Sequence, residues 1–218
     1  MKDLVEERER VLAAFLESEK RRLALCCHAL ARAFARGATL LAYGTGAAAT
    51  DAAHIAVEFM HPVIVGKRAL PALAPPADVF SLMRPGDIGL GVGAGATGFV
   101  ESAHDRGLLT VSFDAGPADY EFAVPADDEY IRQEVHETSY HVLWELVHVF
   151  FDHPDLLADA CITCGDVAVA ARVLAVDNGT ALIERDGLQE QVAIDLVEGV
   201  DVGDVLLCHA GVALEKVP

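Results

Sequence analysis

The stretch ATLLAYGTGAAATDAAHIAVEFM (residues 38–60) predicts a buried strand, a glycine-containing turn and a helix in immediate succession. Its first six residues are a short apolar run that ends in the turn Gly44-Thr45-Gly46. Free backbone amides and the dipole of the following helix both point at such a turn, so it predicts an anion-binding site. The turn lacks the third glycine of a dinucleotide fingerprint and the lysine of a P-loop, which excludes both of those motifs.

The same alternation continues along the chain in both directions. Three further buried strands are expected, at residues 88–92, 108–113 and 120–124. The strand at 88–92 ends in a second glycine-rich turn, and a long last helix is expected at 128–152. Residues 3–35 are expected to form two helices broken around residues 17–19. Strands that alternate with helices through short links predict an α/β fold with a parallel sheet covered by helices.

The pattern changes after Pro154, where short strands are joined by tight turns. The dipeptides Asn178-Gly179 and Asp186-Gly187 suit two-residue hairpin turns, and Ala210-Gly211 separates two more apolar runs. About five short strands follow the change, enough for a small β-barrel. The sequence therefore predicts two domains, residues 1–154 and residues 161–218.

Composition limits the classes of function. The chain has 218 residues, 53% of them hydrophobic, and a formal net charge of −18. So much apolar content excludes global disorder, and no run approaches the ~20 apolar residues that span a bilayer. The acidic balance disfavours nucleic acid and anionic membranes as partners. The densely charged N-terminal residues do not resemble a secretory signal, so a cytoplasmic location is expected.

Two groups of side chains have metal-ligand spacing. His54 and Glu58 are four residues apart on the expected helix and so share one face. Cys161 and Cys164 form a CxxC at the start of the second domain, and His209 lies on one of its last strands. Two thiolates and an imidazole are a soft ligand set that suits iron, zinc or copper.

The cysteine count bears on these thiols. The five cysteines are an odd number in a chain without a signal, which argues against a disulfide framework. Cys208 fits two interpretations, a further sulfur ligand or a small core residue.

The first domain resembles the phosphoheptose isomerases of the sugar isomerase (SIS) superfamily. The resemblance rests on GTGAAATDAAHIAVEF (44–59), RALPALA (68–74) and IRQEVHETSYHVLWELVH (131–148), and covers roughly residues 1–152. It implies an SIS-type sheet, a homodimer or homotetramer, and a small phosphorylated or anionic ligand held at the two turns. By position the ligand-binding residues would be Gly44, Thr45, Gly46 and Thr97.

The same resemblance implies a zinc site and an acid/base pair. The zinc ligands would be His54, Glu58, Gln133 and His141, and Glu58 and His141 would move a proton between adjacent sugar carbons. Gln133 and His141 are about 12 Å apart along an ideal helix, so their side chains must lean together to reach one metal.

The turns depart from the family pattern. Ala48 stands where that family has a serine, and residues 93–96 are glycine and alanine where it is rich in serine and threonine. Those hydroxyls hold the sugar phosphate in the family. We therefore expect a different small ligand, or a structural and oligomeric role, for this domain.

The second domain resembles the HypC/HupF chaperones of [NiFe]-hydrogenase maturation, in CITCGDVAVAARVLAV (161–176) and VGDVLLCHAGVAL (202–214). That resemblance implies a small OB-like barrel on which Cys161 and His209 carry iron with cyanide and carbonyl ligands. The hydrogenase large subunit or other maturation proteins would be the partners. Cys161 is internal here and lacks a free α-amine beside it, so Cys164 is an alternative thiol.

Three functions are left open by the sequence. The first is an accessory protein of hydrogenase maturation, in which the barrel carries the metal precursor or docks on a partner. The second is an active zinc-dependent aldose–ketose isomerase of a sugar phosphate. The third is an SIS domain that senses a ligand and controls the barrel.

Overall fold

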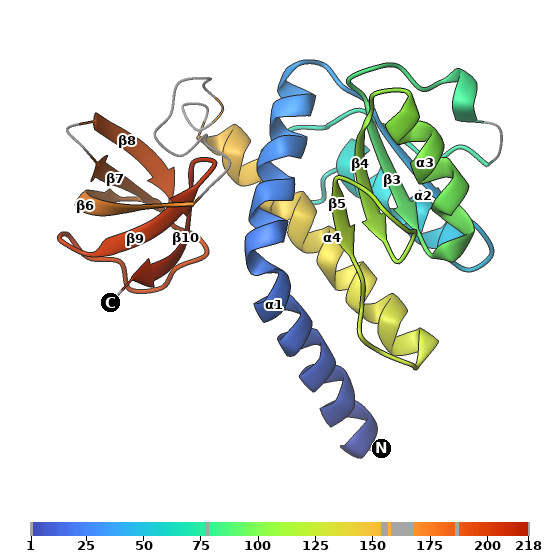
Figure 1. The fold of residues 1–218 in the computed structure, drawn as a ribbon, viewed down its shortest axis with the longest axis horizontal. Helices are drawn as coiled ribbons and strands as arrows, with labels where there is room; N and C mark the ends of the chain where they lie inside the picture. The colour runs from blue at the N-terminus through green and yellow to red at the C-terminus, as the bar shows by residue number, and fades with distance from the viewer. Residues whose placement is uncertain (1, 77–78, 154–156, 158–167, 186–187, 218) are drawn as a thin grey trace. The chain divides into compact units, whose positions relative to one another are not determined.

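The computed structural model describes residues 2–76, 79–153, 157, 168–185 and 188–217 (Figure 1). The chain forms two compact units, Met1–Arg22 with Arg32–Glu145 and Leu23–Ala31 with Leu146–Pro218. The domain limits 1–154 and 161–218 stay a prediction. No helix in the described part of the chain is long and apolar enough to cross a membrane.

A five-stranded parallel sheet forms the centre of the first unit. Its strands are β1 (Leu40–Gly44), β2 (Ala72–Leu73), β3 (Ile88–Val92), β4 (Leu109–Phe113) and β5 (Tyr120–Phe122), in the order β2-β1-β3-β4-β5. The parallel sheet and four of its strands are as predicted, whereas β2 is too short to show a periodic pattern. The order reverses between β1 and β3, and ligands of such sheets bind outside the carboxyl ends of the strands at this point.

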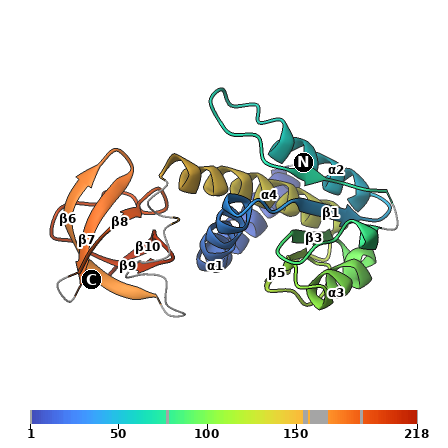
Figure 2. The same ribbon diagram turned by 90° about the horizontal axis from the view of Figure 1, so that it is seen from above.

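The described residues contain the α-helices α1 (Lys2–Ala35), α2 (Ala48–Met60), α3 (Thr97–Asp105) and α4 (Glu129–Asp152). Short 3₁₀ turns lie at Val79–Ser81 and Ala94–Ala96. Figure 2 shows α2 and α4 on one side of the sheet and α3 on the other, which is the layered arrangement predicted from the alternation.

The expected break in the N-terminal helix is wrong, because α1 runs through residues 17–19 without interruption. The polar side chains there are used within the helix. The hydroxyl of Ser18 donates to the Phe15 carbonyl at 2.9 Å, and Glu17 pairs with Lys20 at 2.8 Å. These contacts keep the polar stretch on an exposed face and leave the backbone ladder intact.

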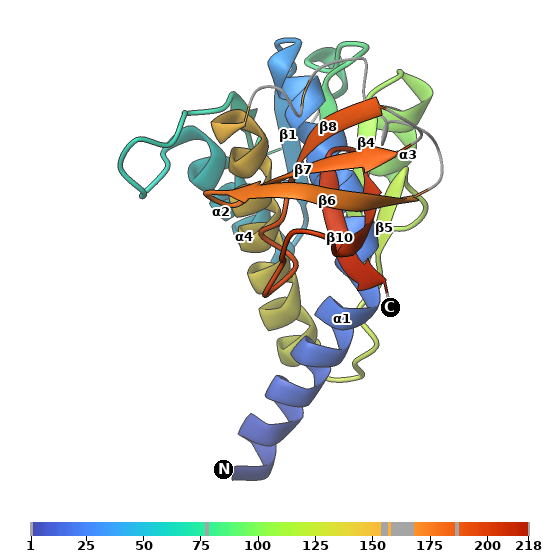
Figure 3. The ribbon, with the colours of Figure 1, turned by 90° about the vertical axis from the view of Figure 1, so that its left-hand side faces the viewer.

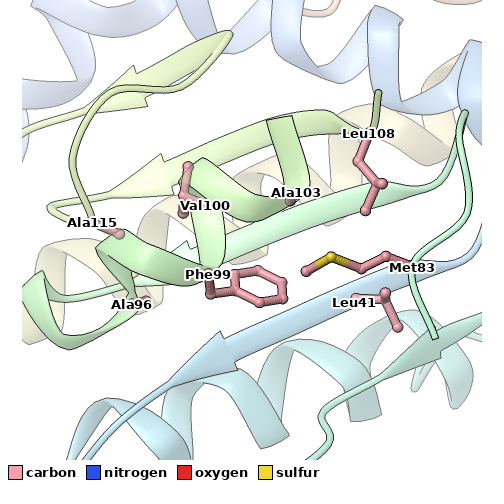
Figure 4. Close-up of a cluster of buried hydrophobic side chains, with 8 residues drawn as sticks. All are labelled: Leu41, Met83, Ala96, Phe99, Val100, Ala103, Leu108 and Ala115. Atoms are coloured by element: carbon pink, nitrogen blue, oxygen red, sulfur yellow. The ribbon is translucent and has the colours of Figure 1, made fainter. Parts of the chain in front are cut away.

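The α3 side of the sheet is closed by a buried apolar cluster, which Figure 4 shows around Phe99 of α3. The helix can approach closely because β3 has glycine at alternate positions. A Cβ atom at Gly89 would lie 2.7 Å from the Ala103 Cβ, and one at Gly91 would lie 2.4 Å from Val100 Cγ2. Both separations are shorter than any normal contact, so these glycines set the distance between helix and sheet.

Gly91→Ala is expected to lower the free energy of unfolding by about 1–3 kcal/mol, because the added methyl overpacks the interface with α3. Gly98→Ala is the matched control, since no atom lies within 4 Å of a Cβ there and the residue is in α3. Alanine should stabilise that helical position by up to about 1 kcal/mol. Urea denaturation of the two variants measures the difference, and a Gly91→Ala protein as stable as Gly98→Ala would contradict this account of the packing.

The second unit contains a closed five-stranded barrel, in the order β10-β8-β7-β6-β9 (Figure 3). Its strands are β6 (Val169–Asp177), β7 (Thr180–Arg185), β8 (Leu188–Ala193), β9 (Val205–His209) and β10 (Val212–Val217). The turn residues Asn178 and Gly179 have φ of 39° and 84°, and Ala210 and Gly211 have 51° and 78°. Positive φ at both positions is what such hairpin turns need, and it confirms these two predicted turns. The Asp186-Gly187 turn lies outside the described residues.

Candidate functional site

The two glycine turns lie next to one another at the carboxyl ends of β1 and β3, which pair in register from Leu40 with Ile88 to Gly44 with Val92. A Cβ atom at Gly95 would lie 1.9 Å from the Thr45 hydroxyl oxygen, so the threonine of the first turn packs directly on the second. The Thr97 hydroxyl donates to the Ala94 carbonyl at 2.9 Å. The hydroxyl proton of Thr97 is therefore already used within its own turn.

Helix α2 starts at the first turn and delivers two of three grouped metal-ligand side chains. His54 and Glu58 of α2 meet His141 of α4, and one donor atom from each lies within 4.8 Å of the others. His54 Nε2 is 3.2 Å from Glu58 Oε1, and His141 Nε2 is 3.9 Å from the same oxygen. The structure thus brings together three of the four zinc ligands predicted from the sequence.

The far nitrogen of His54 is held by α4. His54 Nδ1 lies 2.9 Å from the Tyr140 hydroxyl oxygen and 3.8 Å from Glu137 Oε1. A hydrogen bond at one ring nitrogen fixes the tautomer and the direction of the other, as outer partners of metal-bound histidines do. His54 Nε2 is therefore the nitrogen left to face Glu58 and a metal ion.

Tyr140 is suited to this supporting role. Its side chain is buried, and burial raises the pKa of its hydroxyl above the ordinary value, with Asp51, Glu137 and Glu58 adding to the rise. The hydroxyl therefore stays protonated at any physiological pH, and it remains available as a neutral hydrogen-bond partner of His54.

Two imidazoles and one carboxylate fit a zinc-type ion by their chemistry. Zinc takes nitrogen and oxygen donors of this kind, and sites with three protein ligands leave a further position for water or substrate. The two histidines are also partly accessible, since the side chains of His54 and His141 are 36% and 38% exposed. A small molecule could therefore reach an ion held by these residues from solvent.

Gln133, the fourth predicted ligand, has a partner of its own. Its side-chain nitrogen donates to the Asp51 carboxylate, 3.2 Å from Oδ2 and 3.5 Å from Oδ1. This bond occupies the amide nitrogen and leaves the amide oxygen, the atom that a metal binds. Burial raises the pKa of the Asp51 carboxyl, while the bond from Gln133 opposes that rise. That Gln133 is the fourth metal ligand stays a prediction.

A cavity of about 350 Å³ opens between the first turn, the end of β3 and the start of α4, and Gln133 lines it whereas the three triad residues do not. Its wall contains Ala47, Ala48 and Gly93, which carry no hydroxyl, together with Arg132 and His136. The Arg132 guanidinium donates to the Ala126 carbonyl, and its Nε lies 3.8 Å from Asp114 Oδ2.

His136 forms a dyad that the sequence analysis did not single out. Its Nε2 lies 2.7 Å from Asp114 Oδ2, and Asp114 follows β4 with a positive φ of 53°. A non-glycine residue in that backbone region is strained, and such strain often occurs at functional positions. No spacing in the sequence links the two residues, since they lie 22 positions apart on different elements.

In the barrel, Cys208 and His209 end strand β9. Cys208 is buried in the barrel core with Ala171, Val173 and Ile183, which confirms its interpretation as a core residue. Burial raises the pKa of its thiol to about 12, and the Glu190 carboxylate adds to the rise. His209 is 9% exposed. Cys161 and Cys164 lie outside the described residues.

The Cys208 thiol is therefore expected to resist alkylation in the folded protein. With a pKa of about 12, only about one thiol in 10⁴ is ionised at pH 8, and the thiolate is the reactive form. Iodoacetamide labelling followed by mass spectrometry should modify Cys208 at least about 100-fold more slowly in buffer than in urea. Rapid labelling of Cys208 in buffer would contradict its placement in the core and would favour the alternative that it is a further sulfur ligand.

Comparisons with known proteins agree with this two-part architecture. Residues 167–218 match the model of the HupF/HypC family. The phosphoheptose isomerase of Thermodesulfovibrio yellowstonii is 30% identical over 182 residues, which cover 68% of this chain and 90% of the relative. The phosphoheptose isomerase of Aquifex aeolicus is also 30% identical, and the match covers 67% of this chain and 94% of the relative. The phosphoheptose isomerase structure from Francisella tularensis superposes with a TM-score of 0.62 at 19% identity, over 68% of this chain and 96% of that one.

Proposed function

The chain belongs to the phosphoheptose isomerase family and carries a HupF/HypC domain at its C-terminal end, and from this fusion we propose that it is an accessory protein of [NiFe]-hydrogenase maturation. The observation that carries the proposal is the HupF/HypC match over residues 167–218, which spans the whole closed barrel from β6 to β10. A domain of this family has its role in maturation, whereas an isomerase needs no such barrel.

The barrel takes up an iron precursor with cyanide and carbonyl ligands and passes it to the hydrogenase large subunit or another maturation protein. Cys161 or Cys164 supplies the thiolate, and His209 supplies the imidazole. The position of His209 supports its role, because it is the last residue of β9 and the turn at Ala210 and Gly211 follows directly. Iron is the cargo in this proposal and leaves with the partner.

The larger domain forms a homodimer or homotetramer and binds a small ligand. Zinc is held by His54, Glu58 and His141, with the Gln133 oxygen as the fourth donor. The grouping of the first three donors within 4.8 Å supports the metal, and the Asp51–Gln133 bond supports the orientation of the fourth. When bound, the ion polarises an oxygen of the ligand.

Catalysis of a sugar-phosphate isomerisation is the second candidate function, and the metal triad is the observation that favours it. Glu58 Oε1 and His141 Nε2 lie 3.9 Å apart, so both can reach neighbouring atoms of one bound ligand. In this alternative Glu58 and His141 move the proton, and the barrel is an appendage. The alanine and glycine side of the cavity weighs against a phosphorylated substrate.

Anaerobic purification and metal analysis separate the two candidates. The full chain, produced together with the hydrogenase maturation proteins, should contain iron that is lost in the Cys161→Ala/Cys164→Ala double variant and in His209→Ala but retained in His54→Ala. Air must be excluded because an exposed CxxC oxidises readily. Zinc without iron, together with turnover of a heptose phosphate, would reverse the order of the two candidates.

A further inference from the structure

A second cavity, of about 610 Å³, lies at the amino ends of the strands, whereas the two glycine turns lie at the carboxyl ends. It opens where the chain enters β1 and β3, because Thr39 and Asp87 immediately precede those strands and both line it. The cavity of about 350 Å³ lies at the carboxyl ends of the strands, and no residue of the metal triad lines the second cavity. The two cavities are therefore separate, and nothing in the proposed function uses the second one.

Two arginines from different segments line this cavity. Arg36 follows the end of α1, and Arg84 lies in the loop before β3. Both side chains are exposed, and within the described residues neither guanidinium makes a hydrogen bond or an ion pair. The chain has 34 acidic and 16 basic side chains. With this excess of acidic groups, two arginines at one cavity that form no ion pair within the described residues are an unexpected arrangement.

Asp87 is the one acidic residue in the described lining, and its charge is already engaged. The carboxylate is buried and accepts hydrogen bonds from two backbone amides, that of Thr39 at 2.8 Å and that of Arg84 at 3.2 Å. Its oxygens therefore hold the two chain segments together instead of pairing with the guanidiniums. The cavity keeps an excess of positive charge.

Part of the remaining wall is apolar. Leu73 and Leu82 line the cavity and are 45% and 48% exposed, so both offer apolar surface to a bound molecule. Beneath them Leu41 belongs to the buried cluster of Figure 4, so this side of the cavity rests on a packed core. Ser81 and Thr39 add hydroxyls to the lining.

We infer that this cavity binds a small organic oxyanion, whose phosphate or carboxylate group pairs with Arg36 and Arg84 while an apolar body lies against Leu73 and Leu82. The planar guanidinium group of an arginine can bind a phosphate or a carboxylate group through two parallel hydrogen bonds. The carbonyls at the end of α1 favour a cation near Arg36 in any case, but they do not account for Arg84, which comes from another segment.

Isothermal titration of the full chain with three probes tests this site. Phenyl phosphate and benzoate carry the two oxyanions on the same apolar ring, and inorganic phosphate lacks the ring. Phenyl phosphate or benzoate should bind more tightly than inorganic phosphate, and more weakly as salt is raised. Arg36→Gln and Arg84→Gln should each weaken that binding about tenfold. Leu82→Asn should remove the preference for the ring over inorganic phosphate.

Two controls separate this site from others. Arg21→Gln changes an exposed arginine of α1, about 22 Å along the helix axis from Arg36, and should leave binding unchanged. His54→Ala should also retain it, because no residue of the metal triad lines this cavity. The inference is overturned if no aromatic probe binds, if inorganic phosphate binds as tightly as the better of the two aromatic probes, or if Arg21→Gln weakens binding as much as Arg84→Gln.

Discussion

Replacing His54 by alanine is expected to lower the zinc affinity of the chain by more than roughly 100-fold, the upper end of what loss of an outer partner alone costs. His54 supplies one of three donor atoms grouped within 4.8 Å, and two donors remain without it. Competition with a chromophoric chelator measures the affinity directly. A smaller effect, about tenfold, is expected for Tyr140→Phe, because that change removes only the partner of His54 Nδ1.

His61→Ala is the matched control for this prediction. His61 is exposed and lies just beyond the end of α2, so its loss should leave zinc affinity unchanged. Equal affinities for His54→Ala and the unaltered chain would show that the triad does not hold the metal. Equal losses in His54→Ala and His61→Ala would point to a general disturbance of α2.

The second large effect is expected in catalysis. Turnover of a heptose phosphate by the zinc-loaded chain should have a kcat/KM about 10²–10⁴-fold below that of the Aquifex aeolicus relative under the same conditions. Hydrogen bonds to a charged group contribute about 1.5–3 kcal/mol each, so two missing hydroxyls cost about 10²–10⁴-fold. Alanine occupies positions 48, 94 and 96 of the two turns.

Restoring the hydroxyls provides the matched comparison. Ala48→Ser and Ala94→Ser together should raise the affinity of the first domain for a sugar phosphate, measured by titration. A kcat/KM close to that of the relative, without any added serine, would contradict the proposal and favour the isomerase candidate.

Much of the fold follows from the sequence because its signals are local. Apolar runs, glycine turns and helical spacing occur within ten or so residues, and they predicted the strands at β1, β3 and β4 and the two domains' different architectures. The break expected in α1 was wrong because Ser18 and its charged neighbours find partners one helical turn away, which composition alone does not reveal.

Residues of the candidate site could be predicted from the sequence only where they belong to a recognisable motif. The spacing of His54 and Glu58 is enough to predict that they share a helix face. His141 could be predicted as their partner only from the family resemblance, and the fold does bring it next to them. Asp114 and His136 meet only because α4 crosses the end of β4, and the roles of Asp51 and Tyr140 depend on contacts between α2 and α4. Such pairs are set by tertiary packing, which single-sequence patterns do not contain.

The infrared spectrum of the anaerobically purified full chain, produced with the hydrogenase maturation proteins, tests the central claim most directly. The proposal predicts absorption bands from iron-bound cyanide and carbonyl that vanish in the Cys161→Ala/Cys164→Ala double variant and in His209→Ala and persist in His54→Ala. A Cys164→Ala variant measured beside them shows which of the two neighbouring thiols carries the iron. Absence of these bands from a preparation that contains zinc and isomerises a sugar phosphate would contradict a role in iron delivery.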